Sequence, residues 1–207
     1  MKELNTIKFD RVTYERELTD FEQMLSTHTA LSESTDILPF FKRNRQLSAQ
    51  IGSLIPQLFQ IDKVAFEFDI FGDFKCDLVV GNSQTHRYCF IEFEDATEKS
   101  VFIKKSDKYK PEFAPRFEHG YSQVADWFYK LHNTGDADLE ERFGTHHIEY
   151  SGILIIGRDH YLKPNEKRRL NWRHKHTIVD SKSILTITFD ELLNFLKIQL
   201  PYPINTP

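Results

Sequence analysis

Three acidic residues near the middle of the chain have the spacing of a carboxylate site on paired strands. Asp77 directly precedes the apolar residues 78–80, and Glu92 and Glu94 follow at alternate positions of a second predicted strand, so that they share one face. If the two strands pair, the three carboxylates converge at one edge of the sheet, where they repel one another unless they are protonated or neutralised. A hard divalent cation with oxygen ligands, usually Mg²⁺, resolves that repulsion. The alternative is a solvent-facing edge strand, in which acids are ordinary, and the spacing alone favours this alternative.

Other standard catalytic and cofactor motifs are absent from the sequence. It contains no GxxxxGK[ST] phosphate loop, no GxGxxG fingerprint, no HExxH pair and no GxSxG elbow. The nine histidines lack a spacing that demands zinc, and Cys76 and Cys89 alone cannot build a disulfide framework or a cysteine-only zinc site. The central carboxylates are therefore the main candidates for chemistry.

The composition indicates a folded protein of about one domain. The 207 residues are 40% hydrophobic and carry a net charge of −4, an apolar content too high and a charge too low for a disordered chain. The longest purely aliphatic run, residues 153–156, is too short to span a membrane, and the N-terminus lacks the apolar region of a secretory signal. We expect a cytoplasmic protein without membrane contact.

Hydrophobic periodicity places the carboxylates in an α/β fold. Much of residues 11–60 has helical spacing, and a period of two then predicts three successive strands, in the third of which residues 89, 91 and 93 face away from Glu92 and Glu94. These strands are predicted at 64–70, 75–80 and 87–94, followed by helices at 117–132 and 136–143, strands at 150–157 and 184–189, and a helix at 191–198 capped by Asp190. The pattern predicts a mixed β-sheet flanked by helices, with a helical segment (residues 1–60) packed on a core (residues 61–207).

Further motifs follow in a fixed order. Asp77 lies in FKCDLVV (residues 74–80), Glu92 and Glu94 lie in FIEFEDA (90–96), and Gln123 begins QVADW (123–127) on the next predicted helix. This order resembles the PD-(D/E)XK nuclease superfamily and, in more detail, the Shedu-type nuclease domain of bacterial anti-phage defence. The tail is similar as well, through IGR (156–158), RLNWR (169–173) and TFDELL (188–193), which are more specific to the family than the acids. The resemblance spans roughly residues 35–197 and implies a restriction-endonuclease-like core.

The resemblance also implies an activity, which is metal-dependent cleavage of phosphodiester bonds in phage or plasmid DNA. Asp77 would be the principal metal ligand, joined by Glu92 and the backbone carbonyl of Phe93, with Mg²⁺ as the expected ion and Mn²⁺ as the alternative. Gln123 would orient the nucleophile or a scissile phosphate oxygen. Oligomerisation and a regulatory segment are the usual means of restraint in such nucleases, so we expect a homo-oligomer or a regulatory partner protein.

The sequence departs from the superfamily pattern at Glu94, where that pattern has a lysine that helps to position and activate the water. Three interpretations follow. Glu94 acts as the base or as a further metal ligand; a lysine from elsewhere substitutes, with Lys75, Lys104 and Lys105 as candidates; or the site is inactive and the domain binds DNA or a protein without cutting.

Two basic stretches are candidate DNA-binding surfaces, at residues 99–110 and 163–176. Their bases would contact phosphates without reading sequence, although a merely solvated face is the more frequent meaning of such a run. The expected phosphate contacts are Lys104, Lys105, Arg168, Arg169 and Arg173. Trp172 either packs beneath the basic residues, which is the favoured interpretation, or stacks on a nucleobase. Arg158 either pairs with a core carboxylate or reaches a phosphate.

Overall fold

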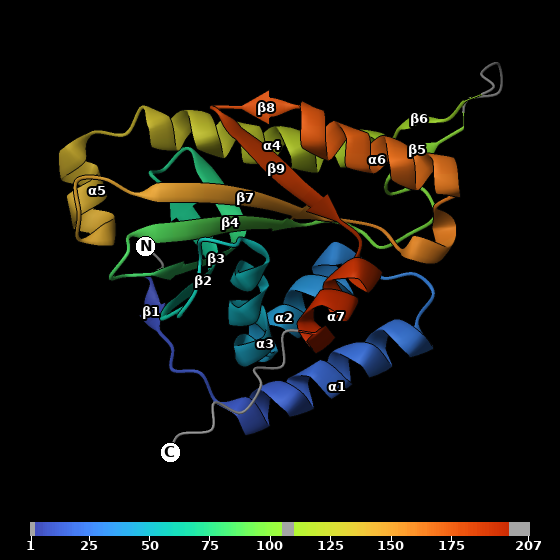
Figure 1. Cartoon of the computed structure of the whole chain (residues 1–207), viewed down its shortest axis with the longest axis horizontal. Coiled ribbons are helices and arrows are strands. Elements are labelled where there is room, and N and C mark those ends of the chain that lie inside the picture. Colours follow the sequence, from blue (N-terminus) through green and yellow to red (C-terminus); the bar gives the residue numbers. More distant parts are fainter. Residues whose placement is uncertain (1–2, 105–109, 199–207) are drawn as a thin grey trace.

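The fold is built on a mixed sheet of seven strands. The computed structural model describes residues 3–104 and 110–198, and its main sheet has the order β1-β2-β3-β4-β7-β9-β8 (Figure 1). The strand bounds are β1 (Asn5–Thr6), β2 (Lys63–Ile70), β3 (Phe74–Asn82), β4 (Arg87–Phe93), β7 (Glu149–Ile155), β8 (Ile178–Val179) and β9 (Lys182–Ile187). A separate two-stranded sheet pairs β5 (Phe102–Ile103) with β6 (Glu112–Phe113). Strands β2, β3 and β4 form an antiparallel meander, whereas β7 pairs in parallel with both β4 and β9.

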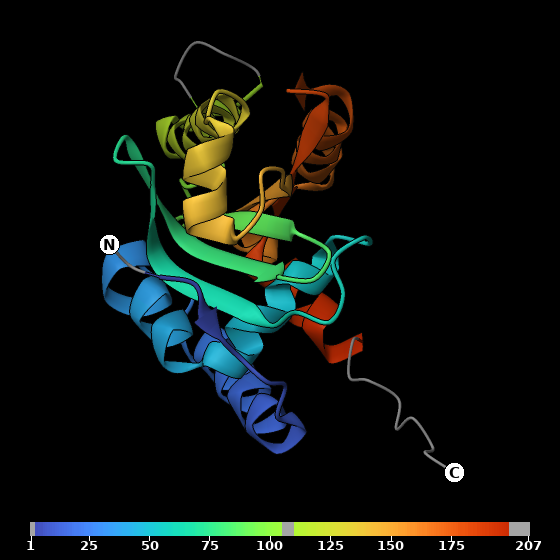
Figure 2. The same cartoon turned by 90° about the vertical axis from the view of Figure 1, so that its left-hand side faces the viewer.

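Helices cover both faces of the sheet. The helix bounds are α1 (Arg11–Thr27), α2 (Leu38–Arg43), α3 (Arg45–Gln50), α4 (Pro115–His132), α5 (Asp136–Phe143), α6 (Pro164–His176) and α7 (Phe189–Ile198), and a π-helical turn spans Glu33–Ile37. Figure 2 shows α1, α2, α3 and α7 on one side of the sheet and α4, α5 and α6 on the other. The predicted fold class, a mixed sheet flanked by helices with a helical N-terminal segment, is confirmed.

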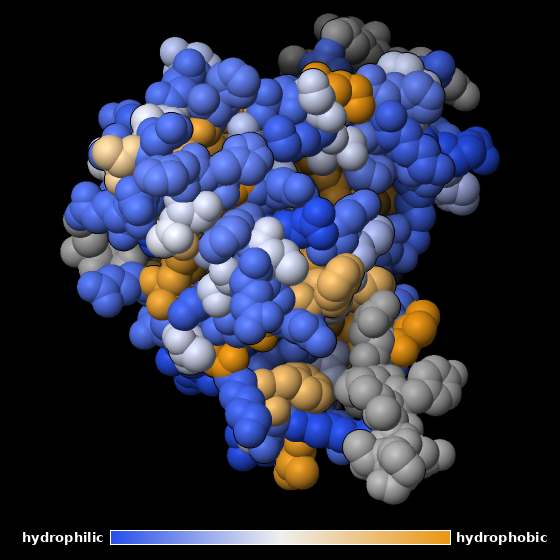
Figure 3. Space-filling model, turned by 60° about the vertical axis from the view of Figure 1, so that its left-hand side comes forward, coloured by the Kyte–Doolittle hydropathy of each residue, from blue (hydrophilic) through white to orange (hydrophobic). Residues whose placement is uncertain are grey.

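Two hydrophobic cores lie on the two sides of the sheet. On β4, Cys89, Ile91 and Phe93 pack into the core beneath α1, α2 and α7, whereas Tyr88 and Phe90 pack into the core beneath α4, α5 and α6. This alternation confirms the predicted facing of the strand, and it explains why a seven-residue strand can be apolar on both sides. The face in Figure 3 is largely hydrophilic, with hydrophobic residues in small scattered groups. Among the described residues, no helix is long and apolar enough to cross a membrane.

The second basic stretch is a helix, which the sequence analysis did not predict. Its residues form α6, and only Glu166 and Leu170 of that helix are buried, because its hydrophobic stripe is too narrow to produce a clear helical periodicity. Trp127 lies fully buried in the core. Trp172 on α6 is 61% exposed, so the favoured interpretation of this residue as packed is wrong.

The predicted capping role of Asp190 is also wrong. The cap of α7 is Thr188, whose hydroxyl accepts from the Glu191 N–H (3.1 Å) while the Glu191 carboxylate accepts from the Thr188 N–H (2.9 Å). Asp190 instead accepts from Arg158 Nε at 2.9 Å and Nη2 at 3.0 Å. Arg158 is thus paired with a carboxylate inside the protein.

Candidate active site

A polar pocket of about 250 Å³ lies where β3 and β4 separate. Its walls include five residues that the sequence analysis singled out and four that it did not. The lining residues are Asp77, Glu92, Glu94, Gln123 and Lys75, together with Glu33, Leu38, Glu67 and His119. The predicted candidates on two strands and one helix therefore share one pocket. Their chemical roles stay predictions.

The end of the β3–β4 ladder sets the position of Asp77. The paired register begins at Leu78 opposite Ile91, and Asp77 lies just beyond it. At this position the Asp77 side chain bonds to β4: the Phe93 N–H donates to Asp77 Oδ2 at 3.0 Å. The N–H and C=O of one strand residue point to the same side, so the Phe93 carbonyl lies on the Asp77 side of β4 as well.

Strands β2 and β3 both break the regular alternation of their side chains next to the pocket. Cys76 packs into the core beneath α4 and Leu78 into the core beneath α1, although residues two apart on a regular strand share a face. Phe66 and Phe68 on β2 are split between the two cores in the same way, and Glu67 between them has φ of 48°. A non-glycine residue in this region is strained, and local distortions of this kind re-aim side chains beside functional sites. Here the breaks fall at Asp77 and Glu67, and both residues line the pocket.

Glu67 binds two lysines at the edge of the pocket. Its carboxylate pairs with Lys75 Nζ at 2.9 Å and with Lys42 Nζ at 2.8 Å. Lys42 lies on α2 next to Phe41, whose ring stacks on Phe93 at 4.4 Å and so fixes the helix above the strand end. Lys42 was not predicted, because nothing in its local spacing links α2 to the end of β4.

Burial makes the pocket carboxyls weak acids. It raises the pKa of Asp77 to about 7, that of Glu92 to about 10 and that of Glu94 to about 8, and it raises the pKa of Glu33 as well. For Glu92, the negative charges of Asp77 and Glu94 act in the same direction as burial, and Arg116 opposes them. Burial therefore favours the protonated form of these groups, and a bound cation would favour the ionised form.

Arg116, in the first turn of α4, pairs with two of the acids that line the pocket. Its Nε forms an ion pair with Glu94 and lies 3.4 Å from Asp95 Oδ2, and its Nη2 forms an ion pair with Glu33. Glu94 is 1% exposed, so its charge depends on this cation. No short-range pattern links Arg116 to Glu94 or Glu33, which lie 22 and 83 positions from it in the chain.

Helix α4 approaches the strand end closely at Gly120. A Cβ atom at this position would lie 2.7 Å from Leu154 Cδ1 and 2.9 Å from Glu94 Cγ, closer than real Cβ contacts allow. The missing side chain therefore makes room for Glu94 beneath the helix. One turn further along α4, Gln123 Oε1 is buried and has no hydrogen-bond partner among the described residues. A buried amide oxygen of this kind indicates a water or a ligand group in the pocket.

The donor set fits a hard divalent cation held by few side chains. Within the described residues, no group of three or more His, Cys, Asp or Glu side chains could hold a metal ion by itself. A site formed by Asp77, Glu92 and the Phe93 carbonyl needs only two side chains, and Mg²⁺ characteristically keeps several waters or phosphate oxygens among its ligands. The ion pair with Arg116 gives Glu94 a partner other than a metal.

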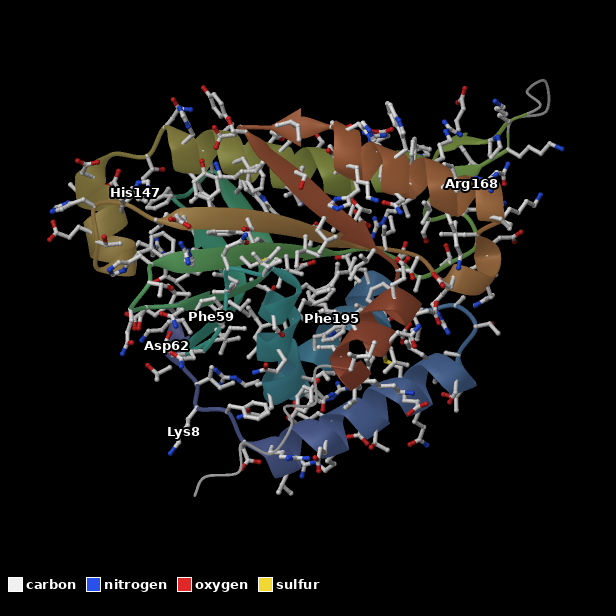
Figure 4. The ribbon with its side chains drawn as sticks, in the orientation of Figure 1. Lys8, Phe59, Asp62, His147, Arg168 and Phe195 are labelled. Atoms are coloured by element: carbon white, nitrogen blue, oxygen red, sulfur yellow. The ribbon has the colours of Figure 1, made fainter. Side chains whose placement is uncertain are left out.

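The predicted phosphate contacts differ in how much of each side chain is available. Lys104 and Arg168 are exposed, and Arg168 is labelled on α6 in Figure 4, whereas Lys105 lies outside the described residues. Arg169 lies over the Phe113 ring at 4.9 Å, and Arg173 lies over the Tyr121 ring at 4.6 Å and pairs with Glu118 at 2.6 Å. Arg169 and Arg173 therefore hold α6 against one aromatic residue of β6 and one of α4.

The comparisons with known proteins assign the chain to a family. The family model described as "Shedu protein SduA, C-terminal" matches residues 30–193, which is well over half of the 207. The chain belongs to this Shedu family. The matched range contains every residue of the pocket, and family membership indicates a role in anti-phage defence. A comparison with curated proteins found no match.

Proposed function

We propose that this Shedu domain is a Mg²⁺-dependent endonuclease that hydrolyses phosphodiester bonds of invading DNA. The observation that carries the proposal is the pocket at the divided end of β3 and β4, where Asp77 is fixed by the Phe93 N–H beside the buried Glu92. Carboxylates that are buried together and have strongly raised pKa values are expected where a cation neutralises them during function. Mn²⁺ is the alternative ion.

The residues of the pocket have separate roles in this proposal. Asp77, Glu92 and the Phe93 carbonyl hold the cation, which when bound lowers the pKa of a water and offsets negative charge on the phosphate. Gln123 orients the attacking water through its unpartnered Oε1. The exposed Lys104 and Arg168 contact the DNA backbone and steer the duplex without reading its sequence.

Glu94 takes the position of the lysine in the superfamily pattern and acts as the general base in this proposal. Its pKa of about 8 lies near the pH of the cell, where a positioned carboxylate combines adequate basicity with a usable ionised fraction. Arg116 supplies the positive charge that the absent lysine would have supplied, and it keeps Glu94 in place. Lys75 is the second candidate, because it lines the pocket, although its ammonium group pairs with Glu67.

Cleavage of supercoiled plasmid and of linear DNA, with Mg²⁺ or Mn²⁺, tests the proposal. We expect the wild type to cut, and both Asp77→Asn and Glu92→Gln to abolish cutting while retaining the fold. Asp126→Asn is the matched control, since Asp126 is an exposed acid on α4 away from the pocket lining, and it should cut normally. Metal titration by calorimetry shows whether a variant that does not cut has lost metal binding or only the chemical step.

If the wild type binds Mg²⁺ and DNA but cuts no DNA, the alternative function is favoured. The domain would then be a non-catalytic module that binds DNA or a partner protein. Failure to bind either metal would remove the physical basis of the nuclease proposal. Light scattering with and without DNA tests the expected homo-oligomer.

A further inference from the structure

Trp172 is an exposed aromatic residue on a helix that is otherwise polar on its outer side. It lies on α6, is 61% exposed, and stacks with its ring plane 11° from that of His176 at 4.9 Å. The helix is anchored on other positions, through the buried Glu166 and Leu170 and through the packed Arg169 and Arg173. Helix α6 is thus held through positions other than the exposed Trp172.

The surroundings of Trp172 are positively charged. Arg168 precedes it by one helical turn and Lys175 follows by three residues, and both side chains are exposed. The acid of α6, Glu166, is buried and accepts from the Lys163 N–H at the start of the helix, so it does not offset these charges at the outer surface. An exposed indole between two cations is complementary to a ligand that has aromatic rings and phosphates.

We propose that Trp172, with Arg168 and Lys175, forms a binding site for an unpaired base of single-stranded DNA. The base stacks on the indole face that His176 leaves open, and the two cations contact the neighbouring phosphates. Single-stranded DNA fits better than a duplex, because paired bases have their faces covered by their neighbours, whereas an unpaired base presents a free face.

The position of α6 connects this site with the carboxylate pocket. Arg173 pairs with Glu118 on α4 at 2.6 and 2.7 Å, and the next residues along α4, His119 and Gln123, line the pocket. A strand held on α6 thus lies beside the helix that borders the candidate active site. This inference takes its DNA partner from the proposed function, and it narrows the substrate to DNA with an unpaired segment, such as an overhang, a flap or a displaced strand.

Intrinsic fluorescence reports this site directly, since the chain has two tryptophans and the other, Trp127, is fully buried. The full chain is titrated with a single-stranded thymidine oligonucleotide, and separately with a duplex of the same length, in EDTA so that cleavage does not interfere. We expect the oligonucleotide to quench Trp172 emission and the duplex to bind with little quenching.

Substitution then measures the contribution of the indole. We expect Trp172→Ala to weaken binding of the oligonucleotide by about tenfold and to leave duplex binding nearly unchanged, in line with the loss of one base–aromatic stack. Trp172→Phe should restore part of the affinity. Tyr129→Ala is the matched control, because Tyr129 is a 70% exposed aromatic on α4, and it should change neither affinity.

Two results would overturn the inference and leave the nuclease proposal intact. The first is equal affinity of the wild type and Trp172→Ala for the oligonucleotide. The second is a change in oligomeric mass on Trp172→Ala without any change in DNA binding, which would make this face a contact between copies of the chain. If the wild type binds neither single-stranded nor duplex DNA, the inference and the proposed DNA partner both fail.

Discussion

Replacing Asp77 by asparagine should stabilise the metal-free protein at alkaline pH. An acid whose pKa is higher in the folded than in the unfolded state destabilises the fold as the pH rises between the two values, because only the unfolded chain then releases the proton freely. For Asp77 the window runs from its ordinary value of 3.8 to about 7. Asparagine removes this ionisation and can still accept the Phe93 N–H through its amide oxygen.

The magnitude follows from the width of that window. At about 1.4 kcal/mol per pKa unit, a window of roughly three units sets a ceiling of about 4 kcal/mol above pH 7. Asp77 keeps partial access to solvent, which reduces the penalty for its charge, so we expect Asp77→Asn to gain about 2 kcal/mol at pH 8 and about half of that at pH 5.

Urea unfolding in EDTA at pH 5 and pH 8 measures this difference, with Asp126→Asn as the control for removal of an exposed acid from α4. Added Mg²⁺ should then stabilise the wild type and have no effect on Asp77→Asn, since an ion that binds only the folded state shifts unfolding by mass action. The reasoning is refuted if the asparagine variant gains no more stability at pH 8 than at pH 5. Neighbouring lysines would in that case already neutralise the carboxylate.

Three further changes test the contacts around the pocket and the tail. Arg116→Met should lower the free energy of unfolding by about 1–2 kcal/mol at pH 9, where Glu94 is ionised, because it removes the cation of a buried carboxylate while the 39% exposure of Arg116 weakens the pair; adding Glu94→Gln should restore most of the loss in a double-mutant cycle, and full additivity would argue against the pair. Gly120→Ala should cost about 1–3 kcal/mol through its clash with Leu154 and Glu94, whereas Gly135→Ala, which has open space around it, should be close to neutral; equal melting temperatures for the two would contradict the close approach of α4. Arg158→Lys should cost about 3 kcal/mol at both low and high salt, since its partners are the Asp190 carboxylate and two carbonyls inside the protein, and strong salt dependence would instead place the pair at the surface.

The strand that carries Glu92 was predictable because its information is local. Residues 89, 91 and 93 alternate with polar and aromatic residues, and a period of two assigns each set to one side of the sheet whatever that side packs against. The buried strand β7 and helix α4 were predictable from local patterns as well, the aliphatic run 153–156 for the strand and an apolar stripe at helical spacing for the helix. Helix α6 was missed, because its few buried residues give almost no periodic signal.

The tertiary structure alone decided the surroundings of the carboxylates. The break in alternation at Glu67 and Asp77 depends on how β2 and β3 pair, since regular spacing would put Cys76 and Leu78 in one core, and likewise Phe66 and Phe68. Lys42 reaches the pocket edge because Phe41 stacks on Phe93, a contact between segments about fifty residues apart.

The sequence by itself determined the order of the acids, the class of fold and the family resemblance, because each of these lies in residue types at short spacings. It could not determine the charge balance of the site. Arg116, Glu33 and Glu94 meet through packing of a helix, a turn and a strand end that lie far apart in the chain, and the exposure of Trp172 depends on which side of α6 the core leaves uncovered. Contacts of this kind arise from how the whole chain packs, which local periodicity does not encode.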